Sequence, residues 1–225
     1  MNLVGSLIYF MVSTRPDIAF AVSSVSRFMT NYGRKHWKAA QRILQYVKTS
    51  KSFGLVYGRQ KTSKFVDNVL YGFADSDWAS DPDDRRSTSG YIFMLNGAAV
   101  GWCSRKQVSA AQALSSCEAE YIAACEATKE VVFLRALLKD LGFEQLGSTR
   151  IYVDNTGAIN MAKNPVISKK SKHIDLRFHY LRHMVASEAV ELVHVNTEDN
   201  VADMLTKSLG KTKLRKFRDL AMGVA

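Results

Sequence analysis

The sequence predicts an α/β (α+β) protein, and three patterns support this prediction. An Asn-Gly pair at residues 96 and 97 lies between two β-rich runs, which is the strongest short-range signal for a β-hairpin. A helical period of apolar residues extends from residue 115 to residue 141. Further β-branched runs alternate with helical patterns after it. The elements are therefore expected in the order β-β-β-α-β-α-α-β-α, preceded by helices.

Composition indicates a packed and basic protein of 225 residues. Hydrophobic residues make up 47% of the chain and the formal net charge is +10, so we expect a polyanionic partner such as a phosphate backbone. Three cysteines without a CxxC pair or a zinc pattern favour a reducing compartment, which predicts an intracellular protein, cytoplasmic or nuclear, that is not secreted. No apolar run reaches the roughly 18 residues of a membrane span, so no membrane partner is expected.

The first 60 residues are predicted to be helical. Thr14 and Asp17 resemble a capping box, with Pro16 in the first turn of the helix. A second, amphipathic helix is expected at residues 34–51. The basic residues on its polar face either follow a nucleic-acid backbone or are simply solvated, and both interpretations stay open. The apolar face of this helix is predicted to consist of Trp37, Ala40, Leu44 and Val47.

The stretch of residues 70–79 combines a buried strand with acidic residues. It starts as an apolar and aromatic run, and it contains Asp75 and Asp77 without a turn residue before them. Burial of an ionised carboxylate without a partner costs several kcal/mol. These acids are therefore expected to bind a cation, to cap an element or to begin the loop that follows. The two strands of the hairpin are predicted after this loop, at residues 91–95 and 98–104.

The long helix carries a carboxylate on its apolar side. Ser115 and Glu118 form a predicted capping box, and Gly142 is the expected C-terminal cap. Glu120 does not share this role, because it lies on the helical stripe that should pack against the sheet. We expect such a carboxylate to pair with a buried base or to hold a metal. The apolar members of the stripe are Ala123, Ala127, Val131, Leu134 and Leu138.

Two more carboxylates lie at the ends of predicted elements. Asp154 ends a strand and precedes a short helix, a position in which it would also serve as a helix cap. Thr197 is expected to begin the last helix, with Asp203 one turn inside it. The remaining elements are predicted as strands at residues 150–153 and 189–195 and as helices at residues 156–163 and 173–187.

Four carboxylates thus recur at a strand end or in the first turn of a helix: Asp75, Glu120, Asp154 and Asp203. Carboxylates that lie together raise one another's pKa and cannot all ionise near neutral pH unless a cation compensates them. Oxygen ligands without Cys or His select hard ions, Mg²⁺ or Mn²⁺. Two such ions can activate a water and stabilise the leaving oxygen in a phosphodiester displacement.

Six strings resemble a known family: GFADSDWA, DRRSTSGYIF, SSCEAEYIAA, IYVDNTGAI, KHIDLRFHYLR and EDNVADMLTKSL. In this order and spacing they resemble the ribonuclease H domain of copia-type LTR retrotransposon Pol polyproteins. The leading strings LVGSLIYFMVSTRPDIAFAV and HWKAAQRILQYVK resemble the C-terminal end of the preceding reverse transcriptase. The resemblance implies an RNase H-like fold, with a five-stranded mixed sheet flanked by helices and a small N-terminal helical segment. The implied division is 1–60 for the end of the reverse transcriptase, 68–210 for the RNase H-like domain and 211–225 for a basic C-terminal tail.

The resemblance also implies a function. It indicates a metal-dependent endoribonuclease, a phosphodiester hydrolase that cleaves the RNA strand of RNA/DNA hybrids. Two Mg²⁺ ions are the implied cofactors, for which Mn²⁺ can substitute, and the partners are the hybrid and the remainder of a reverse transcriptase. The alternative is a catalytically inactive, truncated or domesticated remnant that binds nucleic acid. The catalytic metal ligands that the resemblance assigns are Asp75, Glu120, Asp154 and Asp203, with Asp77 beside them.

Two departures from the family pattern bear on activity. The Tyr-x-Asp-Asp motif of the polymerase does not occur in the sequence, so we do not expect DNA synthesis. Cellular ribonucleases H carry a His in a flexible loop before their last Asp, whereas the only His near that position here is His194, on the predicted strand.

Contacts to the substrate backbone are expected from residues around the site. The 2′-hydroxyl distinguishes RNA from DNA, and helix starts and basic loops are suited to phosphate. Formation of turns and helix caps is the alternative role of the hydroxyl groups among them. The predicted substrate-binding residues are Arg85, Arg86, Ser87, Ser115, Ser116 and Asn155.

Overall fold

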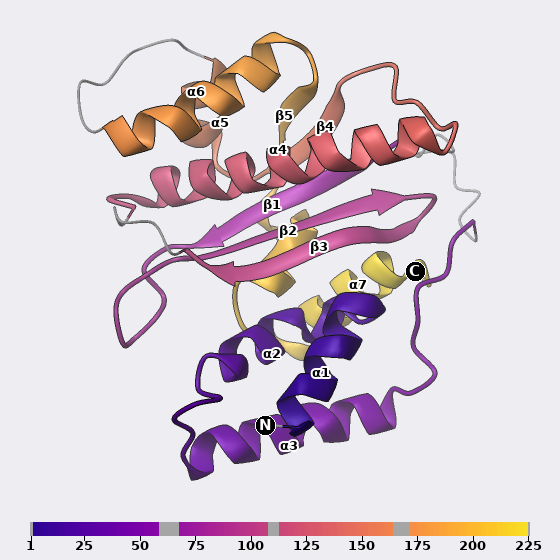
Figure 1. The fold of residues 1–225 in the computed structure, drawn as a ribbon, viewed down its shortest axis with the longest axis vertical. Coiled ribbons are helices and arrows are strands. Elements are labelled where there is room, and N and C mark those ends of the chain that lie inside the picture. The colour runs from indigo at the N-terminus through magenta and orange to yellow at the C-terminus, as the bar shows by residue number, and fades with distance from the viewer. Residues whose placement is uncertain (1, 59–67, 108–112, 164–171, 225) are drawn as a thin grey trace.

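The chain forms a central sheet with helices on both of its faces (Figure 1). The computed structural model describes residues 2–58, 68–107, 113–163 and 172–224, without the side chains of 172–178. The predicted boundary near residue 60 lies outside these ranges. None of the helices in the described part of the chain is long and apolar enough to cross a membrane.

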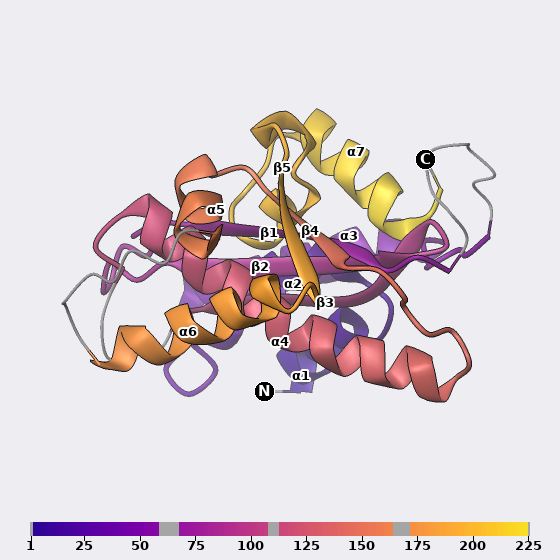
Figure 2. The ribbon, with the colours of Figure 1, turned by 90° about the horizontal axis from the view of Figure 1, so that it is seen from above.

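The five strands form one mixed sheet, as predicted. Strands β1 to β3 make an antiparallel meander, whereas β4 runs parallel to β1 and β5 runs parallel to β4. The strand order is β3-β2-β1-β4-β5, and Figure 2 shows β5 steeply inclined to β2, in keeping with the twist of sheets. The strands are β1 (Tyr71–Asp77), β2 (Thr88–Leu95), β3 (Ala98–Lys106), β4 (Thr149–Val153) and β5 (Val190–His194).

The predicted β2–β3 hairpin is confirmed. Its turn consists of Asn96 and Gly97, whose φ angles are 51° and 90°. A two-residue type I′ turn requires a positive φ at both positions, which Asn and Gly adopt with the least strain. The Asn-Gly pair therefore fixes where β2 ends and β3 begins.

Three helices cover one face of the sheet: α4 (Ser116–Asp140), α5 (Thr156–Lys163) and α6 (Lys172–Ala186). The predicted apolar stripe of α4 is buried along its whole length. The first core of the protein lies here, between α4, α5, α6 and the sheet. Gly142 follows α4 with a φ angle of 84°, which confirms its predicted position at the C-terminal cap.

The 3₁₀ turn η3 (Val201–Leu205) and the helix α7 (Lys211–Met222) pack on the opposite face of the sheet. A further short 3₁₀ turn, η2 (Thr197–Asp199), precedes them. The prediction of one helix from Thr197 through Asp203 is wrong. Asn200, which is fully buried, interrupts it: the side-chain amide donates to the Ala74 carbonyl at 3.0 Å and accepts from the Ala202 N–H at 3.2 Å. The hydrogen bond from Asn200 to β1 fixes the backbone between η2 and η3 in a non-helical conformation.

Residues 211–222 of the predicted basic tail form α7. Its residues Phe217 and Ala221 are buried in a second core with Ile92 and Met94 of β2. The tail therefore contains a helix that packs against the sheet. The division of the chain at residues 60 and 211 stays a prediction.

The N-terminal segment is helical, as predicted, and in Figure 1 its helices lie on the α7 side of the sheet. The capping box at Thr14 and Asp17 is wrong, because the Asp17 carboxylate is used otherwise. It accepts bonds from the Arg15 guanidinium at 2.9 and 2.8 Å and from the Tyr46 hydroxyl at 2.7 Å, in a buried ion pair. The elements are α1 (Asn2–Ser13), η1 (Pro16–Ile18), α2 (Ala19–Ser26) and α3 (Arg34–Thr49).

The predicted apolar face of α3 is correct at Ala40 and Val47 and wrong at Trp37 and Leu44. Ala40 and Ile43 are buried, whereas Trp37 and Leu44 are 45% and 44% exposed. The helices α1 and α2 contact α3 on the side of Ile43 and Val47, so the buried face is rotated away from Trp37 and Leu44.

Turn η3 lies close to β2 at Gly90. A Cβ atom on Gly90 would be 2.7 Å from the Leu205 Cβ and 2.8 Å from the Thr206 Cγ2. Gly90 is also the partner of Asp75 in the β1–β2 register. The absence of a side chain at Gly90 thus brings η3 next to Asp75.

We expect Gly90→Ala to destabilise the protein by about 1 to 3 kcal/mol, because the added methyl group overpacks the contact with η3. Urea unfolding followed by circular dichroism measures the change. Gly101→Ala is the control, since a Cβ there meets Leu134 at an ordinary 3.4 Å. Equal stability of the two variants would contradict close packing at Gly90.

Candidate active site

Three of the predicted carboxylates converge where β1 extends beyond β4. Strand β4 pairs only with Tyr71, Gly72 and Phe73 of β1, so Asp75 lies past the paired part. Asp154 directly follows β4, and parallel strands end at the same edge of a sheet. Glu120 comes from the start of α4, which packs on β1. One oxygen atom from each of Asp75, Glu120 and Asp154 lies within 4.8 Å of the others, so this group could hold a metal ion.

Glu120, and not Glu118, belongs to this group. Its Oε1 accepts from the Ser76 N–H at 3.1 Å, and its buried Oε2 has no hydrogen-bond partner among the described residues. Glu118 faces the start of α4 instead, where Ser115 Oγ accepts from its N–H at 3.2 Å. The predicted capping box is correct in this bond only, because Glu118 Oε2 accepts from the N–H of Leu114 at 2.7 Å rather than from that of Ser115.

Asp154 is not the cap of α5. The Asn155 Oδ1 accepts from the Ala158 N–H at 3.1 Å and fills that role. The Asp154 Oδ2 accepts from the Thr197 hydroxyl at 2.8 Å, which ties the end of β4 to η2. The capping alternative for Asp154 is therefore wrong, and its carboxylate is available to the acidic group.

Asp203 is fully buried and lies beside the group of three rather than within it. Its carboxylate pairs with the ammonium groups of Lys207 at 2.9 Å and Lys213 at 3.0 Å. The same Lys207 Nζ is 3.6 Å from Asp75 Oδ2. The Thr206 hydroxyl donates to the Asp75 carboxylate. Lysine thus joins Asp203 to Asp75.

Sequence reasoning missed Lys207, Lys213 and Thr206. A signal existed for Lys207, which is four residues after Asp203, a spacing at which opposite charges meet on a helical turn. Lys213 carried no comparable signal, because its position depends on how α7 packs. Thr206 meets Asp75 only through the tertiary contact of η3 with β1.

Burial and the charges of neighbouring carboxylates raise the pKa of Asp75 and of Glu120. Burial raises the pKa of Asp75 to about 6, with the charges of Asp203 and Asp154 adding to the rise and Lys207 opposing it. Burial, followed by the charges of Asp75 and Asp154, raises the pKa of Glu120 to about 9. Burial alone would lower the pKa of Lys207, but the surrounding carboxylates outweigh it and raise that pKa. The site therefore favours positive charge.

Part of the predicted substrate-binding set lies at the surface. Arg85 is exposed in the loop after β1, and Ser115 and Ser116 are exposed at the start of α4. The hydroxyl of Ser87 is buried and accepts a hydrogen bond from the Ala79 N–H at 3.1 Å. Ser87 therefore stabilises a turn, which was the alternative role predicted for the hydroxyl groups. The side chain of Arg86 lies 3.5 Å from Asp84, and that of Asn155 caps α5.

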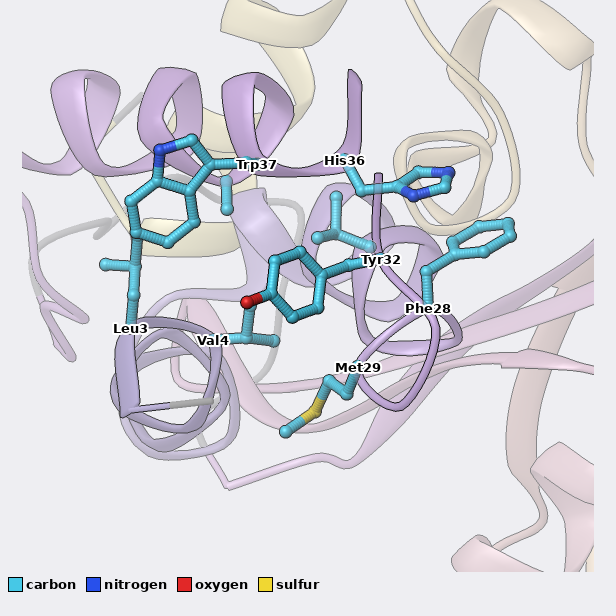
Figure 3. A pocket seen from close by; sticks show the side chains of 9 residues that line it. Leu3, Val4, Phe28, Met29, Tyr32, His36 and Trp37 are labelled. Carbon is cyan, nitrogen blue, oxygen red and sulfur yellow. The ribbon is translucent and has the colours of Figure 1, made fainter. Parts of the chain in front are cut away.

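The described part of the chain also contains cavities outside the acidic group. A small apolar pocket of about 50 Å³ lies between α1 and α3. Figure 3 shows Leu3, Tyr32 and Trp37 among the side chains that line it. A larger cavity of about 560 Å³ lies between the N-terminal helices and the segment that follows η3. Lys207 lines this second cavity, which therefore borders the acidic site.

The raised pKa of Glu120 predicts a pH-dependent stability of the metal-free protein. The folded state binds this proton more tightly than the unfolded chain, so stability is lost as the pH rises from about 4.5 through about 9. Glu120→Gln removes this loss, and we expect it to be more stable than the wild type by on the order of 2 kcal/mol at pH 8 and about equally stable at pH 4. Urea unfolding in EDTA measures both values.

Glu118→Gln is the control for this experiment, because its side chain lies on the same turn but outside the group of three. A Glu120→Gln variant that is no more stable than wild type at pH 8 would contradict the electrostatic account of the site.

Known proteins resemble the chain at the levels of sequence and structure, although no protein-family model matches it. The retrovirus-related Pol polyprotein from transposon TNT 1-94 of Nicotiana tabacum is 42% identical over 219 residues, which are 97% of this chain and 16% of the polyprotein. The corresponding polyprotein from transposon RE1 of Arabidopsis thaliana is 38% identical over 216 residues, or 96% of this chain and 14% of the polyprotein. Secreted RxLR effector protein 161 of Plasmopara viticola is 46% identical over 134 residues, which are 60% of this chain and 89% of that protein.

Two solved structures add to these relatives. A foamy viral protease-reverse transcriptase in complex with double-stranded DNA shares the fold, with a TM-score of 0.52, 11% identity and coverage of 87% of this chain and 31% of that one. LC11-RNase H1 in complex with an RNA/DNA hybrid has a TM-score of 0.45 and 15% identity, and the match covers 61% of this chain and 93% of that one. The chain spans about one sixth of the length of the Pol polyproteins that it matches. Along nearly its whole length, the chain is therefore similar in sequence to one segment of the retrovirus-related Pol polyproteins of transposons.

Proposed function

We propose that the chain contains the ribonuclease H domain of a copia-type Pol polyprotein and hydrolyses the RNA strand of RNA/DNA hybrids. The observation that carries the proposal is the group of Asp75, Glu120 and Asp154, whose oxygens lie within 4.8 Å of one another. The sequence similarity to the Pol polyproteins of transposons supports it. In this proposal residues 1–60 are the end of the reverse transcriptase and residues 68–210 the nuclease.

The donor set of the site fits Mg²⁺ or Mn²⁺. All three ligands are carboxylates, and no Cys or His belongs to the group among the described residues, which suits a hard divalent ion. The buried Oε2 of Glu120, which has no hydrogen-bond partner in the described part of the chain, is where a cation would complete the coordination. When bound, the two predicted ions would supply a nucleophilic water and stabilise the leaving oxygen.

The protein groups around the site would position the substrate. Thr206 and the Ser76 N–H orient the carboxylates of Asp75 and Glu120, so that both present oxygen to the same space. The exposed Arg85 and the N-terminus of α4 at Ser115 and Ser116 would bind the nucleic-acid backbone. Asp203 would act with the group of three from its position beside Asp75.

The proposed location and partners follow from this role. A domain that acts on the hybrid intermediate of a transposon would work inside the cell, together with the remainder of the reverse transcriptase. The basic net charge of +10 would favour association with the phosphate backbone. The alternative function is a non-catalytic remnant, which would keep this binding and lose cleavage.

Cleavage of a hybrid with end-labelled RNA tests the proposal. We expect the wild type to cut the RNA strand in Mg²⁺ or Mn²⁺ and to stop in EDTA. Asp75→Asn and Glu120→Gln should each reduce the rate by more than about 100-fold, because each loses one of the few ligand charges of the site. Glu118→Gln is the matched control and should cut like the wild type.

Salt-sensitive binding of the hybrid without cleavage, equal in the wild type and the variants, would contradict the nuclease function. The remnant function would then be adopted.

His194 should not take part in the reaction. It lies at the end of β5 with an exposed side chain, and it does not belong to the acidic group. We therefore expect His194→Ala to keep the rate and the pH profile of cleavage. A change in the alkaline or acidic limb of the profile would contradict this expectation.

A further inference from the structure

Lys207 lies between two carboxylates in the position that a bridging cation would take. Its Nζ is 2.9 Å from Asp203 Oδ1 and 3.6 Å from Asp75 Oδ2. The two acids are almost completely buried, at 0% and 2% side-chain exposure, whereas the side chain of Lys207 is 34% exposed. The ammonium group thus enters a buried acidic pair from the solvent side. Lys213 adds a second ammonium at 3.0 Å from Asp203.

The other half of the site has no such compensation. Among the described residues, no Lys or Arg nitrogen pairs with Glu120 or Asp154 within 4.0 Å. The nearest protein donors to these acids are the neutral Ser76 N–H and the Thr197 hydroxyl. The site is therefore electrostatically asymmetric, with a neutralised pair at Asp75 and Asp203 and an uncompensated pair at Glu120 and Asp154.

The asymmetry affects two divalent ions differently. An ion at Asp75, Glu120 and Asp154 would meet carboxylate oxygens that no lysine contacts directly, apart from the longer contact of Lys207 with Asp75. An ion between Asp75 and Asp203 would meet the Lys207 ammonium in the same space, and like charges at this distance repel strongly in a buried site. The second ion can bind there only if Lys207 moves away.

The cavity beside the site gives Lys207 room to move. Lys207 lines the space of about 560 Å³ between the N-terminal helices and the segment after η3. The side chain is long and flexible and is 34% exposed, so its withdrawal costs less than that of a fully buried group. The N-terminal helices thereby form part of the wall against which Lys207 would rest.

We propose that Lys207 is a positioning residue that holds the place of the second cation, so that the two divalent ions bind in order and with different affinities. The first ion binds at Asp75, Glu120 and Asp154. The second binds between Asp75 and Asp203 after displacing the Lys207 ammonium. This inference rests on the proposed metal-dependent function.

Titration of the free protein with Mn²⁺, followed by the electron paramagnetic resonance signal of unbound Mn²⁺, tests the inference without measuring cleavage. We expect the wild type to bind one Mn²⁺ tightly and a second at least about 10-fold more weakly. Lys207→Met removes the competing ammonium, so the second Mn²⁺ should bind at least about 10-fold more tightly than in the wild type. Lys207→Arg, which keeps the charge, should behave like the wild type.

Two further variants test whether the change in Mn²⁺ affinity is specific to the contact between Lys207 and Asp203. Lys216→Met is the matched control, because Lys216 lies on α7 and pairs with Asp199 without contacting Asp203. It should leave both Mn²⁺ affinities unchanged. Asp203→Asn should weaken the second Mn²⁺ and leave the first, and this variant tests the order of binding even if Lys207→Met does not fold.

The outcomes distinguish the inference from the function on which it rests. Two Mn²⁺ ions of equal affinity in the wild type, or no change of the second affinity in a folded Lys207→Met, would overturn the role of Lys207 and leave the metal site standing. Binding of no Mn²⁺ by the wild type, or binding that Glu120→Gln does not weaken, would overturn the metal-dependent function and this inference with it.

Discussion

The repulsion between buried carboxylates is the constraint on which the rest of the structure depends. Asp75, Glu120 and Asp154 lie close enough for their charges to interact, and burial raises the pKa of both Asp75 and Glu120. Such a group is costly to assemble unless cations or bound protons compensate it. The Lys207 ammonium lies near Asp75, and both Lys207 and Lys213 pair with the neighbouring Asp203. Such a site lowers the free energy of unfolding, and the same carboxylates attract cations.

The architecture around the site combines groups from both faces of the sheet. Helix α4 brings Glu120 from one face, and η3 brings Asp203 and Thr206 from the other. They meet at the edge of β1 because β4 stops early and leaves that part of the strand uncovered. Gly90 lets η3 approach, and the buried Asn200 fixes it to the Ala74 carbonyl. Backbone geometry thus determines which acids can meet.

The N-terminal helices are joined to the sheet domain by charge as well as by apolar contact. The Asp81 carboxylate, in the loop after β1, pairs with Arg27 of α2 at 2.6 Å and with Lys106 of β3 at 2.8 Å. The same loop carries Arg85, a proposed contact to nucleic acid. The N-terminal segment therefore supports the loop that follows β1, and it also contributes a wall to the cavity that Lys207 lines.

The sequence by itself determined the features that depend on neighbours along the chain. The hairpin at Asn96 and Gly97, the buried stripe of α4 and the different surroundings of Glu118 and Glu120 follow from local geometry and period, and the structure agrees with all three. The same local rules failed at Asp17, where a buried ion pair with Arg15 replaced a cap, and at Asn200, where a bond to β1 divided a helix.

Only the tertiary structure decided what surrounds the acids. The sequence singled out four carboxylates, but it could not separate Asp203, paired with lysines, from the group of three, because Lys213 reaches it from a helix that pattern alone did not predict. It likewise gave no sign that Thr206 would meet Asp75 across more than a hundred residues of chain. Local periodicity shows which face of an element is buried. Local periodicity does not show which charged groups lie together on that face, because they come from segments that are distant in the sequence. The energy of each buried charge depends on the partners that folding places around it.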